Sequence, residues 1–297
     1  MIFTSYGLLA SLSLGLLLAA AGLWYRREKI SVHVWLQLCI AAIPLALVGS
    51  RLLFSVSAII NGDFSAPVQA LYAWDGGASI TGAFIGVVLA AVIISKLNRI
   101  PCGKLLDGVA LGAPVALVVE RLAEFPVDMG IGRPVDTEFL YFLGHFTDDR
   151  HPVFLYEAVI ALILLVVLGF IALSKQKRRP GDLLLIFMTL YGTTQVLMES
   201  LRDDAHMVIY YIRLNQVAAL VMAVIAFVIW MIRWARSGAK PVSLAVASGL
   251  VTGGIALGIF QEFAVDSNPN LLLEYAIMAL ALALIAAVSL TVRTKAD

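Results

Sequence analysis

The sequence is poor in charged residues, and this shortage narrows the class of protein. Only 14% of its 297 residues are charged and 61% are apolar, whereas a soluble domain usually carries about 25% charged residues. An ordinary soluble domain is therefore excluded. The net charge of +1 gives no reason to expect a nucleic-acid partner.

Cysteine is also scarce. Cys39 lies within an apolar run and Cys102 lies in a basic connection. Neither is placed for an extracytoplasmic disulfide, and no spacing of cysteine and histidine fits a metal site. We expect two inert thiols and no metal.

Long apolar runs, by contrast, are abundant. Each is long enough to cross a hydrocarbon core of about 30 Å at 1.5 Å per residue. They are continuous rather than alternating, which predicts helices. The expected fold is all-α, a polytopic transmembrane helical bundle. Its nine spans are roughly 4–24, 34–57, 77–97, 104–121, 153–174, 182–201, 208–232, 242–261 and 271–291.

The connections between these spans differ in charge. Most of the 21 Lys and Arg residues fall in every second connection, and the alternate connections are rich in acids. The positive-inside rule predicts an N-terminus outside and a C-terminus inside. The first span has no basic residue before Arg26, which is the reverse of a secretory signal, so we expect a retained helix.

Ionisable side chains gather near the outer ends of several spans. Burying an arginine at membrane depth costs free energy unless it forms an ion pair or is hydrated. A set of ionisable residues at this depth therefore indicates a functional site. Because arginine matches phosphate in a bidentate manner, we expect a cationic, acid-flanked cavity for a phospholipid headgroup. Ion pairs that only stabilise packing are the alternative. The residues are Arg51, Arg121, Glu157, Glu199 and Arg202.

A stretch of small residues leads into the third span. It reads W-D-G-G-A-S-I-T-G from Trp74 to Gly82, and Gly82 and Gly86 form a G-x-x-x-G step. Such a step lets helix backbones approach closely. Tight packing and a narrow polar slot opening to the outer leaflet are two interpretations of it.

The last two spans carry no charge at membrane depth, and we predict a peripheral hairpin without chemistry of its own. Lipid contact is the simpler interpretation of its surface. A membrane protein partner bound along 242–291 is the alternative.

The polar motifs together resemble those of the prolipoprotein diacylglyceryl transferase family, in the same order along the chain. The resemblance runs from Tyr6 to about Trp230. It implies a seven-helix membrane domain over 1–236, with 122–151 as an extracytoplasmic head loop, and an additional hairpin over 237–297. The similar segments are Y-G-L from Tyr6, G-S-R-L from Gly49, W-D-G-G-A-S-I-T-G, E-R-L-A-E-F followed by G-R-P, H-P-V-F-L-Y-E from His151, R-P-G from Arg179, and Y-G-x-x-Q-x-x-x-E-x-x-R from Tyr191.

This resemblance implies an enzyme of the bacterial cytoplasmic (inner) membrane. Such an enzyme moves the diacylglyceryl group of phosphatidylglycerol to the thiol of a lipobox cysteine in a preprolipoprotein signal peptide. No cofactor is implied, because the substrate supplies the nucleophile. Arg121 matches an arginine expected to hold the headgroup, and Tyr6 a tyrosine expected to be needed for activity. The other implied site residues are Thr81, His151, Glu157, Gln195, Glu199 and Arg202 for catalysis and Arg51 and Gly82 for lipid binding.

Four positions depart from the family pattern. Thr81 stands where a histidine is usual, and threonine cannot act as a general base because it does not titrate near neutral pH. Glu124 replaces the signature asparagine, Met129 a glutamate and Gln195 an arginine.

These departures leave two functions open. The first is an active transferase in which His151, His145 or Glu124 replaces the missing base. The second is a non-catalytic relative that binds phospholipid or a membrane partner, as a subunit of a larger complex. A transporter is disfavoured, because its charges would lie near the midplane.

Overall fold

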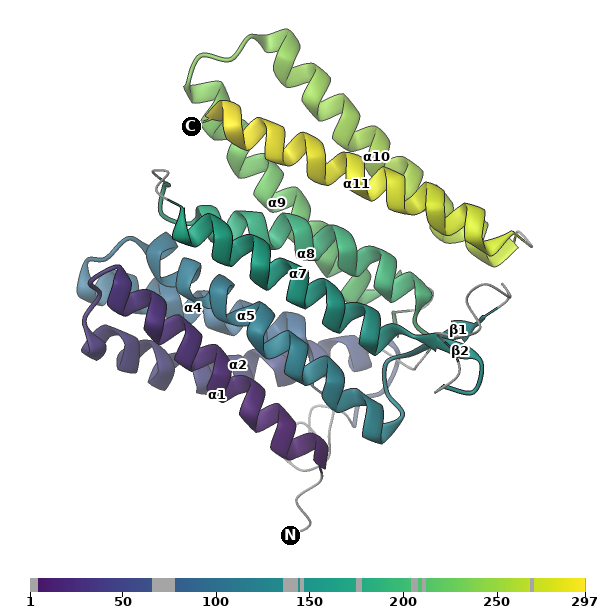
Figure 1. The fold of residues 1–297 in the computed structure, drawn as a ribbon, viewed down its shortest axis with the longest axis horizontal. Coiled ribbons are helices and arrows are strands. Elements are labelled where there is room, and N and C mark those ends of the chain that lie inside the picture. Colours follow the sequence, from purple (N-terminus) through teal and green to yellow (C-terminus); the bar gives the residue numbers. More distant parts are fainter. Residues whose placement is uncertain are drawn as a thin grey trace. The chain divides into compact units, whose positions relative to one another are not determined.

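A computed structural model describes residues 5–65, 78–135, 144, 147–174, 178–203, 208–209, 212–267 and 270–296. Within these ranges the chain is largely helical (Figure 1), which confirms the all-α class. The described residues contain nine helices that are long and apolar enough to cross a membrane, and each predicted span overlaps one of them. They are α1 (Ser5–Arg27), α2 (Val32–Ile60), α4 (Ile80–Asn98), α5 (Cys102–Glu124), α7 (Val153–Leu173), α8 (Asp182–Leu201), α9 (Leu214–Arg236), α10 (Pro241–Ser267) and α11 (Leu271–Ala296).

Most predicted boundaries differ from the observed ones by a few residues; α10, for example, ends at Ser267 rather than at 261. Three of the differences bear on the site. Helix α4 begins at Ile80 rather than at 77, because the Ser79 hydroxyl caps it by accepting a hydrogen bond from Gly82 N at 3.3 Å. Helix α5 continues past 121 to Glu124. Helix α9 begins at 214 rather than 208, because β3 (Val208–Ile209) and β4 (Ile212–Arg213) pair antiparallel before it.

The chain divides into two compact units. The first consists of Met1–Val119, Leu165–Leu184 and Ala205–Asn215, and the second consists of Glu120–Leu164, Leu185–Asp204 and Gln216–Asp297. Helices α5, α7 and α8 each contribute residues to both units.

In the first unit, α2 and α4 pack backbone against backbone. A Cβ atom on Gly82 would overlap the carbonyl oxygen of Gly49, and one on Gly86 would overlap the carbonyl oxygen of Leu45. Only glycine leaves room for this approach. The tight packing predicted from the G-x-x-x-G step is confirmed.

The start of α8 is fixed within the same unit by a buried carboxylate from α5. Asp107 accepts hydrogen bonds from Gly181 N at 2.8 Å and from Leu184 N at 3.1 Å. The first backbone N–H groups of a helix have no partner within the helix. Asp107 therefore satisfies two donors that would otherwise be buried without acceptors.

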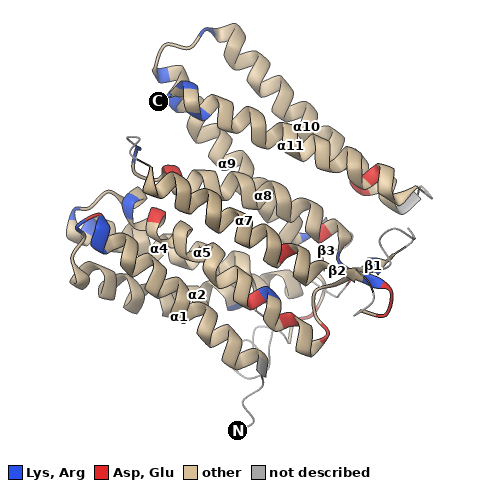
Figure 2. Ribbon diagram, viewed as in Figure 1, with Lys and Arg blue, Asp and Glu red and all other residues tan. Residues whose placement is uncertain are grey.

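Basic connections of the first unit lie together at one end (Figure 2). Lys104 Nζ lies 3.7 Å from Glu28 Oε2, and the guanidinium of Arg178 lies 5.7 Å from the ring centre of Trp24. In the second unit, Lys295 Nζ lies 5.2 Å from the ring centre of Trp234. The first unit thus brings basic residues from separate connections to one end, and in the second unit the basic C-terminal end of α11 lies beside the end of α9.

Helices α10 and α11 form an antiparallel hairpin in the second unit (Figure 1). The middle of this hairpin is apolar, as predicted. Its end is not: Glu262 accepts a hydrogen bond from Gln216 Nε2 at 2.7 Å, and the Glu274 side chain is buried. These carboxylates lie at one end of the hairpin, and the absence of charge at membrane depth stays a prediction.

Candidate functional site

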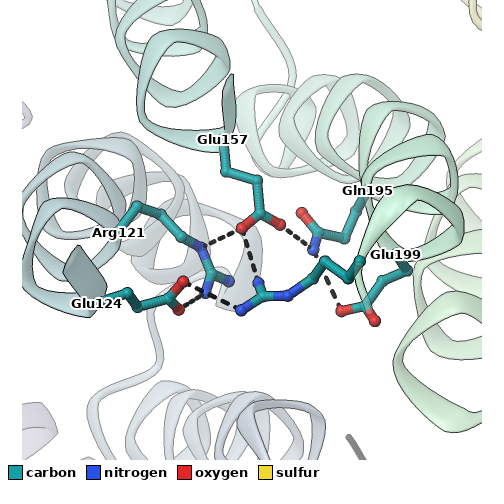
Figure 3. A network of polar contacts seen from close by, with 6 residues as sticks. Arg121, Glu124, Glu157, Gln195 and Glu199 are labelled. Atoms are coloured by element: carbon teal, nitrogen blue, oxygen red, sulfur yellow. Dashed lines mark hydrogen bonds and ion pairs between the residues drawn. The ribbon is translucent and has the colours of Figure 1, made fainter. Parts of the chain in front are cut away.

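A buried polar network lies in the second unit, where the end of α5, the start of α7 and the end of α8 meet (Figure 3). Most of its members were predicted as site residues from the sequence. Its side chains are Arg121, Glu124, Glu157, Gln195, Glu199 and Arg202.

Four of these side chains form a closed ring of alternating charge, hereafter the ion-pair ring. Arg121 pairs with Glu124 and places its Nε 3.1 Å from Glu157 Oε2. Arg202 Nη2 lies 3.0 Å from Glu124 Oε2, and Arg202 Nη1 lies 2.8 Å from Glu157 Oε2. Each guanidinium therefore contacts both carboxylates, and each carboxylate contacts both guanidiniums.

Gln195 connects the ion-pair ring to Glu199. Its Nε2 donates to Glu157 Oε1 at 2.5 Å and to Glu199 Oε1 at 3.4 Å. Gln195 and Glu199 are four residues apart on α8 and share a face, as their spacing predicted. The amide thus joins two carboxylates that would otherwise repel each other.

The ring is almost fully enclosed. The exposed fraction of the side chain is 9% for Arg121, 1% for Arg202, 4% for Glu124 and 3% for Glu157. A charge buried to this degree is tolerated only with partners, and removing one partner from such a pair costs about 3–5 kcal/mol. The ring is therefore expected to hold the ends of α5, α7 and α8 together as well as to place charged groups in the site.

The network contains more carboxylates than guanidiniums. Three carboxylates and two guanidiniums give a net charge of −1 when all are ionised. The predicted cationic cavity also included Arg51, which belongs to the first unit, so that cavity stays a prediction. Within the network, Glu124 adds a negative charge and Gln195 adds none. Two of the four departures from the family pattern thus fall within one network.

Strands from the head loop fix the end of α8 beside the network. Strands β1 (Ile131–Pro134) and β2 (Arg150–Pro152) pair antiparallel, and Gly132 forms a bridge with Arg202. Asp203 N donates to Ile131 O at 3.1 Å. Arg150 Nε donates to Gly132 O at 3.0 Å, and its guanidinium pairs with Asp203. The backbone of Arg202 is thereby set by long-range contacts as well as by its own helix.

His151, a predicted catalytic residue, lies in β2. Its Nδ1 is 3.1 Å from the hydroxyl of Tyr156, which lies in the first turns of α7 together with Glu157. The structure therefore gives His151 a partner on the helix that supplies Glu157 to the ring. His145, the other histidine considered as a base, lies outside the described residues.

Four predicted site residues belong to the first unit: Tyr6, Arg51, Thr81 and Gly82. Tyr6 lies at the start of α1, and Arg51 is half-buried in α2. Thr81 lies in the first turn of α4, beside the glycine that contacts Gly49. The segment from 74 to 77, which begins the small-residue stretch, lies outside the described residues.

Sequence reasoning missed the role of Glu124 as a bridge between two arginines. It placed the end of the fourth span at 121 and so left Glu124 in a loop, as a replaced asparagine. The sequence did contain a signal for this pairing, because Arg121 and Glu124 are three residues apart and such residues are neighbours on a helix. Extending α5 by one turn would have paired Glu124 with Arg121.

Comparison with known proteins gives the same family over most of the chain. The family profile described as prolipoprotein diacylglyceryl transferase matches residues 2–232, which contain the whole network and end before α10. Three relatives carry the name phosphatidylglycerol–prolipoprotein diacylglyceryl transferase. The one from Halalkalibacterium halodurans is 30% identical over 206 residues, covering 65% of this chain and 70% of the relative. Those from Rhizobium meliloti and Beijerinckia indica are 31% and 33% identical, covering 65% and 61% of this chain and 69% and 68% of the relatives. The chain therefore belongs to the prolipoprotein diacylglyceryl transferase family.

Proposed function

We propose that this chain is an enzyme of the bacterial cytoplasmic membrane that moves the diacylglyceryl group of phosphatidylglycerol to the thiol of a lipobox cysteine. The main support for this activity is the buried network. It gathers Arg121, Glu157, Gln195, Glu199 and Arg202, all at positions implied by the family resemblance, from three helices within the segment that the family profile covers.

The proposed reaction forms a bond between the cysteine sulfur and a glycerol carbon of the lipid and breaks the bond from that carbon to the phosphate oxygen. Glycerol phosphate leaves with the bonding electrons, and the thiol proton passes to a base. Arg121 and Arg202 are the proposed partners of the phosphate, because guanidinium matches its geometry. Glu157 and Glu199 are proposed to orient the two arginines and Gln195.

The proton acceptor must be a group other than residue 81. Thr81 cannot accept the proton near neutral pH. His151 is the proposed base, because imidazole titrates in that range and Tyr156 orients the ring. Arg51 and Gly82 stay proposed lipid-binding residues and Tyr6 a proposed catalytic residue, as the family resemblance implies.

A second function is favoured by the ion-pair ring itself. Both guanidiniums already bind two carboxylates each, so a phosphate would have to displace one of them. The negative charge of the network opposes an anionic headgroup. These observations favour a non-catalytic relative over an enzyme that holds the headgroup at Arg121 and Arg202. Its proposed ligand is a phospholipid bound away from the ring or, along 242–291, a membrane protein partner.

We infer that the N-terminus lies outside and the C-terminus inside the cell. In the first unit, basic residues from several connections gather at one end, and in the second unit those of the α9–α10 connection lie at the same end as those near the C-terminus (Figure 2). Under the positive-inside rule that end faces the cytoplasm. Residues 1–236 then form the transferase-like domain with 122–151 as its outer head segment, and 237–297 form an additional hairpin.

Complementation separates the two functions. The chain is expressed in cells depleted of their own transferase, and diacylglyceryl modification of a reporter lipoprotein is followed. The enzyme proposal predicts modification by the wild type and its loss in Arg121→Ala, together with weaker binding of phosphatidylglycerol. Absence of modification by correctly inserted wild-type protein, with lipid binding retained, would establish the second function instead.

A further inference from the structure

The α10–α11 hairpin reaches the site-bearing end of α8 through a hydrogen bond. The hydroxyl of Tyr275, one turn into α11, donates to the carbonyl oxygen of Ser200 at 3.0 Å. Ser200 lies in the last turn of α8 and is fully buried. It stands between Glu199 and Arg202, two members of the buried network.

This carbonyl needs a partner from outside its own helix. The last four C=O groups of an α-helix have no N–H partner within the helix, and a polar backbone group without a partner is costly in an apolar environment. Tyr275 therefore satisfies an acceptor that α8 itself leaves open. It does so from a helix that lies beyond the residues matched by the family profile.

Helix α10 makes a second connection, through Gln216 of α9. The Nε2 of Gln216 donates to Val196 O of α8 at 3.2 Å and to Glu262 Oε2 of α10 at 2.7 Å. Val196 follows Gln195, the amide that joins Glu157 and Glu199. Helix α11 thus contacts the end of α8 that carries the network directly, and α10 is connected to it through Gln216.

We propose that the α10–α11 hairpin is an internal brace for the site, and that Tyr275, Glu262 and Gln216 are positioning residues for Glu199 and Arg202. The head-loop strands hold the same end of α8 through Gly132 and Ile131. The end of α8 is therefore fixed between two elements. This inference concerns the placement of the network and does not depend on whether the chain transfers diacylglyceryl groups.

Amide hydrogen exchange of the full chain in phospholipid nanodiscs tests the brace. Tyr275→Phe removes the hydroxyl and keeps the ring. One net hydrogen bond corresponds to roughly a fivefold change in an opening equilibrium, so the amides of Arg202 and Asp203 should exchange about fivefold faster. Thr291→Val is the matched control, because the Thr291 hydroxyl donates only to its own helix, at Ala287 O, among its described contacts. Equal exchange at Arg202 and Asp203 in these two variants would overturn the proposal.

A second pair of variants tests the α10 connection independently. Glu262→Gln keeps an oxygen that accepts from Gln216, whereas Glu262→Ala removes it. Exchange around Gln195 and Val196 should stay near wild type in the first variant and rise severalfold in the second. If Glu262 acted only through general packing, the two variants would exchange alike. Equal exchange in Glu262→Gln and Glu262→Ala would therefore show that α10 is not part of the brace.

Discussion

Replacing Glu124 with asparagine tests the ion-pair ring most directly. Glu124 contacts the guanidiniums of Arg121 and Arg202, and its side chain is only 4% exposed. The substitution removes the carboxylate, shortens the side chain by one methylene and restores the residue type usual in the family. Glu157 is then the carboxylate of the ring that remains for both arginines.

The expected destabilisation follows from this burial. Removing one partner from a buried ion pair costs about 3–5 kcal/mol, because the other charge stays buried. Asparagine keeps one hydrogen-bond acceptor and Glu157 keeps its contacts. We therefore expect a loss of unfolding free energy at the lower end of this range, about 3 kcal/mol. The matched control is Glu28→Gln. It breaks the pair with Lys104, whose side chain is 39% exposed, and such a pair contributes about 0–1 kcal/mol.

The assay is the free energy of unfolding of the full chain in detergent, measured by denaturant titration for both variants. If Glu124→Asn lowers it no more than Glu28→Gln does, the ring is not what holds these helices, and the reasoning fails. A second measurement tests how the net charge of the network affects lipid binding. Binding to phosphatidylglycerol vesicles should strengthen from wild type to Glu124→Asn and again on adding Gln195→Arg, because the net charge of the network rises from −1 to 0 to +1. No change across this series would contradict the view that the negative charge of the network opposes an anionic headgroup.

Three further substitutions test other parts of the structure. Thr81→His should raise reporter-lipoprotein modification above the wild-type rate, because it adds an imidazole to the one that His151 is proposed to supply; an unchanged rate would show that a histidine at position 81 does not accept the thiol proton. Gly82→Ala should lower the free energy of unfolding by about 1–3 kcal/mol through overlap with the Gly49 carbonyl, whereas Gly15→Ala, where a Cβ would meet no atom within 4 Å, should not. Asp107→Ala should lower it by about 1–3 kcal/mol for each buried donor left without an acceptor; a loss below 1 kcal/mol would show that water replaces the carboxylate.

The sequence alone was enough to predict the membrane class and the approximate position of each helix. A run of about 20 apolar residues must be helical in a hydrocarbon core, because no other single segment satisfies its backbone there. A close approach of some helix to α4 was also predictable, because Gly82 and Gly86 remove side chains from one helix face; that α2 is the partner came from the structure. Pairing of Gln195 with Glu199 followed from helical spacing.

The tertiary structure decided how the predicted polar residues pair and with what net charge. Glu124, Glu157 and Arg202 come from three helices, so their contacts depend on how those helices pack, which no local pattern encodes. The hydrogen bond from Tyr275 to Ser200 likewise depends on where the hairpin lies against α8. Apolar periodicity and helix spacing act over one or two turns, whereas pairing across helices is set by the whole core. That difference in range is why the positions were predictable and the ion-pair ring and the brace were not.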